Sequence, residues 1–123
     1  MKITLLSEEA IRLEGTAGPL TIEAASAEQS YSPFHMLASS LASCTWSVLA
    51  SWAEHKGLDV GQLAVDVDWT FAEQPKRVGS IRVGLKWPGL SADLHERALR
   101  VAALCTVHKT LEHPPAISIE HTA

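Results

Sequence analysis

The longest weakly charged stretch in this sequence, residues 33–53, strongly limits what the chain can fold into. It is long enough to cross a bilayer, but its several serines and one histidine favour a buried helix of a soluble protein. Ser32 and Pro33 form a strong helix start, because Ser is favoured at the N-cap and Pro at the first helical position. Gly57, directly after Lys56, supplies a stop. The pattern predicts one helix over residues 33–56, about 36 Å long.

This helix has one apolar stripe and almost no charged face. The stripe recurs in steps of three and four, through Phe34, Leu37, Leu41, Cys44, Val48 and Trp52. Met36, Trp46 and Leu49 lie off the stripe, and small residues fill much of the remaining surface. A helix that is apolar or small on every side is buried on every side. Because a chain of 123 residues has little material to cover it, we expect a homodimer.

The rest of the chain predicts short strands and a second helix in one α+β domain, residues 1–123. Three short strands are expected before the long helix, over residues 2–6, 10–14 and 19–24. Strict alternation over 63–71 and 81–87, around a turn at 74–77, predicts an antiparallel hairpin. A second helix is expected from the cap at Ser91 to His113, followed by a last strand over 116–120. The predicted order is βββ-α-ββ-α-β.

Charge and composition exclude several classes of partner. Ten Lys and Arg against 14 Asp and Glu give a net charge of −4, without a run of like charge. A nucleic acid or an anionic membrane surface would call for a basic face, so neither is expected as a partner. The first twenty residues carry acids where a signal peptide needs an apolar segment, which predicts a cytoplasmic protein.

Two cysteines, Cys44 and Cys105, are the first residues that can carry chemistry. Each is predicted to lie in the middle of a helix, on the face that packs inward. In a reducing cytoplasm they do not form a structural disulfide, so they are either a reactive pair or two small buried apolar residues. Zinc is not expected, because there is no C-x-x-C pair and His108 adds a third ligand only by chance.

Two segments resemble the OsmC/Ohr family of bacterial peroxide-handling proteins. Residues 32–44, SPFHMLASSLASC, resemble the family's first cysteine helix, and residues 99–111, LRVAALCTVHKTL, resemble its second. The resemblance covers roughly residues 30 to 120. It implies an OsmC-like fold with a long central helix and an intertwined homodimer, with two sites at the interface between the subunits.

The resemblance also implies an activity. Cys44 would attack an apolar organic hydroperoxide as a thiolate and become a sulfenic acid, and Cys105 would resolve it to a disulfide. No cofactor is expected, and an external dithiol would restore both thiols. A nearby cation would lower the pKa of Cys44. The alternative is an OsmC-like protein that binds small molecules or senses redox state without efficient peroxidase activity.

This chain departs from the family pattern where the cation should be held. Peroxidatic members carry a Glu directly after the proline to orient an Arg against the thiolate, but here that residue is Phe34. Arg12 is the only arginine before the helix and is therefore the candidate for the cation, and Glu28 is the candidate for the missing carboxylate. The alternative is that both are ordinary solvent-exposed residues. His35 and His108 are candidates beside the thiols and, with Phe34, for a substrate pocket, or else hydrogen-bonded core residues.

Overall fold

The computed structural model describes residues 2–7, 10–14 and 32–123, with side chains from residue 32 onward. The chain divides into two compact units, Met1–Ser30 and Tyr31–Ala123. In the first unit, β1 (Lys2–Ser7) pairs antiparallel with β2 (Ala10–Glu14), and Arg12 lies opposite Thr4. These two predicted strands are therefore present, whereas the strand predicted over 19–24 lies outside the described residues.

The second unit begins with α1 (Pro33–Lys56), whose bounds are those that the sequence predicts. The Ser32 side chain accepts a hydrogen bond from the backbone N–H of His35, and the His35 side chain accepts one from the backbone N–H of Ser32. This reciprocal cap satisfies two N–H groups that the first turn would otherwise leave unpaired. At the other end Gly57 has φ 68°, a left-handed conformation that glycine adopts without strain.

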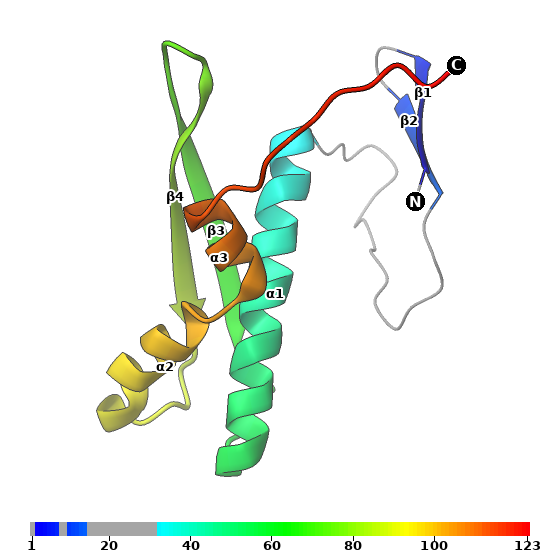
Figure 1. Ribbon diagram of the computed structural model, residues 1–123. Coiled ribbons are helices and arrows are strands. Elements are labelled where there is room, and N and C mark those ends of the chain that lie inside the picture. The colour runs from blue at the N-terminus through cyan, green and yellow to red at the C-terminus, as the bar shows by residue number, and fades with distance from the viewer. Residues whose placement is uncertain (1, 8–9, 15–31) are drawn as a thin grey trace. The chain divides into compact units, whose positions relative to one another are not determined.

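The predicted hairpin is formed by β3 (Ala64–Ala72) and β4 (Arg77–Lys86) and packs against α1 through β3 (Figure 1). Val67 lies opposite Val83 and Trp69 opposite Ile81, so the alternating apolar residues face one another across the pair. The register shifts between Thr70 and Phe71, which is a β-bulge. β4 starts at Arg77 rather than at the predicted Ile81, because the strand continues past this bulge toward the turn.

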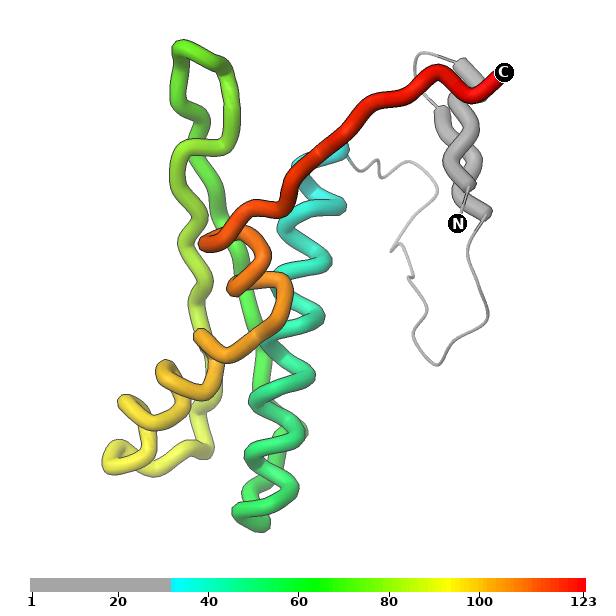
Figure 2. The backbone as a smooth tube through the Cα atoms, in the orientation of Figure 1, coloured from blue at the N-terminus to red at the C-terminus, as the bar shows by residue number. Residues whose placement is uncertain are grey.

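The single helix predicted from Ser91 to His113 is wrong. The chain instead forms a short 3-10 turn, η1 (Ala92–Leu94), and two helices, α2 (His95–Ala102) and α3 (Thr106–Glu112). The tube in Figure 2 shows the change of direction between the two helices. No Gly or Pro marks the break, and the apolar spacing continues through it. Both α2 and α3 pack against α1. The turn between them allows this segment to contact two parts of α1, which a single straight helix would not do.

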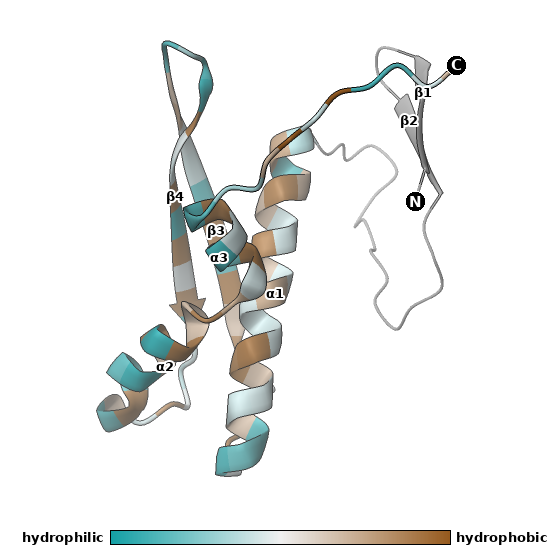
Figure 3. Ribbon diagram, viewed as in Figure 1, coloured by the Kyte–Doolittle hydropathy of each residue, from teal (hydrophilic) through white to brown (hydrophobic). Residues whose placement is uncertain are grey.

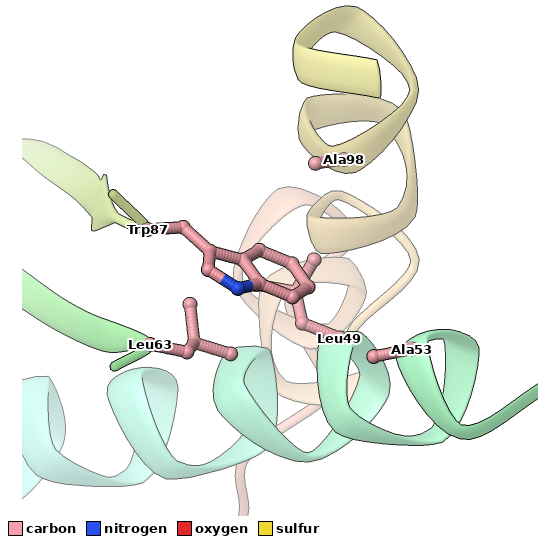
Figure 4. Close-up of a cluster of buried hydrophobic side chains, with 5 residues drawn as sticks. All are labelled: Leu49, Ala53, Leu63, Trp87 and Ala98. Carbon is pink, nitrogen blue, oxygen red and sulfur yellow. The ribbon is translucent and has the colours of Figure 1, made fainter. Parts of the chain in front are cut away.

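The core lies between α1, α2 and the ends of the hairpin (Figure 4). It is formed by Leu49, Ala53, Leu63, Trp87 and Ala98. The Trp87 ring stands edge-on to Trp52, at 6.1 Å between ring centroids, and its Nε1 donates to the Asp59 carbonyl at 3.0 Å. The apolar body of this side chain is thereby buried while its polar atom keeps a partner.

The buried stripe of α1 is not the predicted one. It consists of Leu41, Thr45, Leu49 and Ala53, whereas Cys44 is only partly buried. From Thr45 onward the stripe runs one residue beyond the predicted positions, a rotation of about 100° around the helix. Figure 3 shows why periodicity alone was misleading: apolar and small residues alternate along α1, and strongly hydrophilic residues lie only near its two ends.

The last predicted strand, 116–120, is also wrong in this chain. Residues 114–123 contain neither helix nor strand, and the side chains of Ile117 and Ile119 are 84% and 96% exposed. An isolated strand is not stable without a neighbour to accept its hydrogen bonds, whatever its β-propensity. Within the described part of the chain, none of the helices has the length and apolar character needed to span a membrane.

Candidate functional site

The two cysteines lie where α1 packs against α3. Cys44 is in the middle of α1, one turn after the buried Leu41, and is partly exposed. Cys105 is fully buried at the N-cap of α3, with an extended backbone at φ −54° and ψ 132°. Its Sγ accepts a hydrogen bond from the backbone N–H of His108 at 3.4 Å. The break between α2 and α3 therefore places Cys105 at a helix start rather than in the predicted mid-helix position.

The environment of Cys44 favours the thiolate. Burial raises the pKa of Cys44, but hydrogen bonds from the Cys105 thiol and from the backbone N–H groups of Val107 and Thr106 outweigh it. The net effect is a lowered pKa. Donors directed at a sulfur stabilise its charged form, so Cys44 carries a larger thiolate fraction than an ordinary cysteine.

The environment of Cys105 does the opposite. Burial and the hydrogen bond with Cys44 raise the pKa of Cys105, and the His108 N–H and the Thr45 hydroxyl lower it only in part. In the free dithiol form seen here, Cys105 thus holds its proton and donates it toward Cys44. The pair divides into one accessible sulfur with thiolate character and one buried sulfur that stays protonated, which is an arrangement for a nucleophile and its partner.

A hollow of about 520 Å³ is lined by residues one turn from each cysteine. It is bounded by α1, β4 and α3, and its lining includes Leu37, Leu41, Val83, Leu111, His108 and Glu112. Neither sulfur lies on its wall, but Leu41 is one turn from Cys44, and the His108 backbone N–H donates to the Cys105 sulfur. The volume is within the usual range for small-molecule sites, and most of the lining is apolar.

His108 and Glu112 form the polar edge of this hollow. His108 Nε2 lies 3.3 Å from Glu112 Oε1, and Lys109 Nζ lies 3.5 Å from the same oxygen. Burial acts to raise the pKa of Glu112, but His108 and Lys109 lower it overall. A carboxylate held in this way fixes the orientation of the His108 ring, one turn beyond Cys105.

The remaining predicted site residues are Phe34, His35, Arg12 and Glu28. Phe34 and His35 stand in the first turn of α1, about 15 Å along the helix from Cys44. Phe34 contacts Phe71 edge-on at 4.9 Å between centroids, and His35 contacts Trp69 in the same way at 5.1 Å while it also caps the helix. Arg12 lies on β2 in the first unit. Glu28 lies outside the described residues.

Sequence reasoning missed several groups of the site. Thr45, Glu112 and the backbone N–H groups of Thr106 and Val107 take part in the site without having been predicted. The only available signal was the Thr that directly follows each cysteine. Among the described residues, no group of three or more His, Cys, Asp or Glu side chains is arranged to hold a metal ion.

Comparison with protein-family models identifies one family. A family model described as OsmC-like protein matches residues 26–120. A crystal structure of an osmotic stress induced and detoxification response protein from Psychrobacter arcticus 273-4 is similar, with a TM-score of 0.62 and 25% identity over 68% of this chain. The match spans 62% of that protein, less than two thirds of its length. A search of curated proteins gave no match.

Proposed function

Because this chain belongs to the family of OsmC-like proteins, we propose that it is a thiol-dependent peroxidase that reduces organic hydroperoxides through Cys44 and a Cys44–Cys105 disulfide. The observation that carries the proposal is the unequal protonation of two sulfurs in hydrogen-bond contact. The pKa of the more accessible Cys44 is lowered, whereas that of the buried Cys105 is raised. Only the thiolate of such a pair is a good nucleophile.

In the first step the Cys44 thiolate attacks the terminal oxygen of the hydroperoxide. The S–O bond forms as the O–O bond breaks, so that Cys44 becomes a sulfenic acid and the alkoxide leaves and takes a proton to give the alcohol. His108, held by Glu112 at the edge of the hollow, is proposed as the source of that proton. The apolar lining of the hollow suits a fatty or aromatic hydroperoxide better than hydrogen peroxide.

In the second step the Cys105 sulfur attacks the sulfenic sulfur and expels hydroxide, which takes a proton to become water. The product is the Cys44–Cys105 disulfide, and an external dithiol then reduces it by exchange. Arg12, with Glu28 to orient it, is proposed as the cation beside Cys44. Among the described residues, hydrogen bonds from Cys105, Val107 and Thr106 already lower the pKa of Cys44, so part of the stabilisation of its thiolate does not require a cation.

The test is hydroperoxide consumption by the wild type and by two cysteine variants. Cys44→Ser is expected to abolish consumption of cumene hydroperoxide, because the nucleophile is lost. Cys105→Ser is expected to allow one oxidation and then stop. By mass spectrometry, the wild type treated with a single equivalent should lose two hydrogen atoms, and Cys105→Ser should gain oxygen. Ser47→Ala is the matched control, because this exposed hydroxyl in α1 bonds only to the Ser43 carbonyl, at 2.9 Å.

Two comparisons sharpen the assay. Cumene hydroperoxide should be consumed faster than hydrogen peroxide, and a dithiol should sustain turnover better than a monothiol. Equal activity in the wild type and both cysteine variants would contradict the peroxidase proposal.

The second candidate function is a module that binds small molecules or senses redox state. Phe34 favours it, because this apolar ring stands 38% exposed where peroxidatic relatives carry a carboxylate. Under this alternative the wild type would form the disulfide with a hydroperoxide but turn over slowly with every dithiol. Rapid multiple turnover would exclude it.

A further inference from the structure

The Thr45 hydroxyl is buried and is not bonded to a carbonyl of its own helix. Ser40, Ser47 and Thr110 each donate to a backbone carbonyl three or four residues earlier, at 2.7 to 2.9 Å. Thr45 is 1% exposed, and its Oγ1 is the one buried side-chain oxygen or nitrogen without a hydrogen-bond partner among the residues from 32 onward. A buried hydroxyl without a hydrogen bond lowers the stability of the folded protein, so its presence calls for a functional explanation.

The nearest reactive group to this hydroxyl is Cys105. Thr45 lies on the buried stripe of α1 and lines a small hollow of about 150 Å³ with Ala103 and His108, which flank Cys105 in the chain. The Thr45 hydroxyl makes no hydrogen bond in the resting protein, but it stabilises the ionised form of Cys105 and so lowers the pKa of that thiol. The titratable groups around Cys105 are Cys44 on α1 and His108 on α3, and the His108 ring pairs with Glu112.

We propose that Thr45 is the positioning residue of the resolving step, and that its unpaired hydroxyl becomes a hydrogen-bond donor to Cys105 when that sulfur loses its proton. In the resting protein the Cys105 proton is directed at Cys44, so the thiol does not need this donor. Oxidation of Cys44 to the sulfenic acid changes this, because Cys105 must then act as the nucleophile. A thiolate buried at 0% exposure requires donors within the protein, and Thr45 joins the His108 N–H in that role.

This inference rests on the proposed function, in which Cys105 resolves the sulfenic acid. The step is balanced: Cys105 gives up its proton, its sulfur forms the S–S bond to Cys44, and the S–O bond breaks. Hydroxide leaves with the electron pair of that bond and takes a proton to become water. Thr45 exchanges no electrons or protons with the substrate and acts only through Cys105.

The first test measures ionisation of Cys105 without any peroxide. In a Cys44→Ala background Cys105 is the sole cysteine, and isotope-labelled cysteine reports its titration through the Cβ chemical shift in NMR. Thr45→Val keeps the branched shape but removes the hydroxyl, and it should raise the titration midpoint by about one pKa unit, the effect of losing one hydrogen bond to a charged group. Thr45→Ser keeps the donor and should leave the midpoint unchanged. Ser47→Ala is the control for loss of a hydroxyl from the same helix.

The second test measures the resolving step in the two-cysteine protein. After a single equivalent of hydroperoxide, Thr45→Val should form the sulfenic acid at the wild-type rate and close the disulfide about tenfold more slowly at neutral pH. Thr45→Ser should close it at the wild-type rate. Should Thr45→Val fail to fold, Thr45→Ala replaces it in both tests, because it removes the hydroxyl without adding an apolar group.

The outcomes separate this inference from the proposed function. An unchanged Cys105 midpoint in Thr45→Val, or an equal shift in Thr45→Val and Thr45→Ser, would overturn the role of the hydroxyl even in an active peroxidase. Loss of hydroperoxide consumption by the wild type would instead overturn the peroxidase, whatever the titration gives. A shift in Ser47→Ala as large as that in Thr45→Val would also count against Thr45.

Discussion

At the scale of single residues, two neighbouring cysteines differ in acidity. Cys44 and Cys105 are in hydrogen-bond contact, and their environments move their pKa values in opposite directions. The difference comes from donors: backbone N–H groups of Thr106 and Val107 are directed at Cys44, while burial dominates at Cys105. The pKa difference within this pair is therefore set by position and not by residue type.

The proton that Cys105 donates predicts a pH dependence. Cys105→Ala removes a donor that lowers the pKa of Cys44, so the pKa of Cys44 should rise, by up to about one unit. The thiolate fraction at neutral pH should fall, and the half-maximum of Cys44 alkylation by iodoacetamide should move to higher pH. Cys105→Ser leaves a hydroxyl donor in place and should keep the half-maximum close to that of the wild type. Identical pH profiles for the two variants would exclude Cys105 as the donor.

At the scale of elements, the hairpin and the long helix provide the framework that holds the site. β4 lines the hollow beside the thiols, and its position depends on the bulge near Gly79. A Cβ at residue 79 would lie 2.6 Å from the Ala72 Cβ and 3.2 Å from the Ala72 backbone nitrogen. Only glycine allows the strands to approach this closely, since real Cβ atoms do not tolerate such contacts.

This close approach predicts the effect of a single methyl group. Gly79→Ala should destabilise the protein by about 1–3 kcal/mol, because the strands must separate to accommodate the overlap. Gly89→Ala is the matched control: a Cβ there meets nothing within 4 Å, and its effect should stay within about 0.5 kcal/mol. Chemical denaturation followed by tryptophan fluorescence measures both. Equal stability of the two variants would show that the hairpin relaxes freely at the bulge.

At the scale of the whole molecule, the described residues from 32 onward leave much apolar surface exposed. Several large apolar side chains of the second unit stay exposed, and the most exposed are Leu99 at 60%, Leu104 at 66%, Ile117 at 84% and Ile119 at 96%. Soluble monomers rarely expose apolar groups in contiguous patches, and an unpaired apolar segment such as 116–120 is suited to pairing with another chain. We therefore retain the homodimer as a proposal.

The proposed dimer predicts both a mass and a concentration dependence. Light scattering after size-exclusion chromatography should report about twice the chain mass of 13.3 kDa, with and without reductant, so that a disulfide between chains is excluded as the cause. The unfolding midpoint should rise with protein concentration, because association is linked to folding. A stable folded monomer at micromolar concentration would contradict the proposal.

The sequence by itself was sufficient for those elements whose signals are local. The bounds of α1 follow from Ser32, Pro33 and Gly57, since capping and helix stops involve neighbouring residues only. The β3–β4 hairpin follows from strict alternation, and the family follows from the residues around the two cysteines.

Tertiary structure alone decided the rest. The break before Cys105 has no local breaker, and it exists because α2 and α3 both pack against α1. The buried face of α1 could not be identified from a helix without a charged face, so packing selected Thr45 and Leu49. The opposite pKa shifts of the two cysteines arise from burial and from donors on α3, a helix distant from Cys44 in sequence. Hydrogen bonds and burial act through space and leave no periodic trace along the chain.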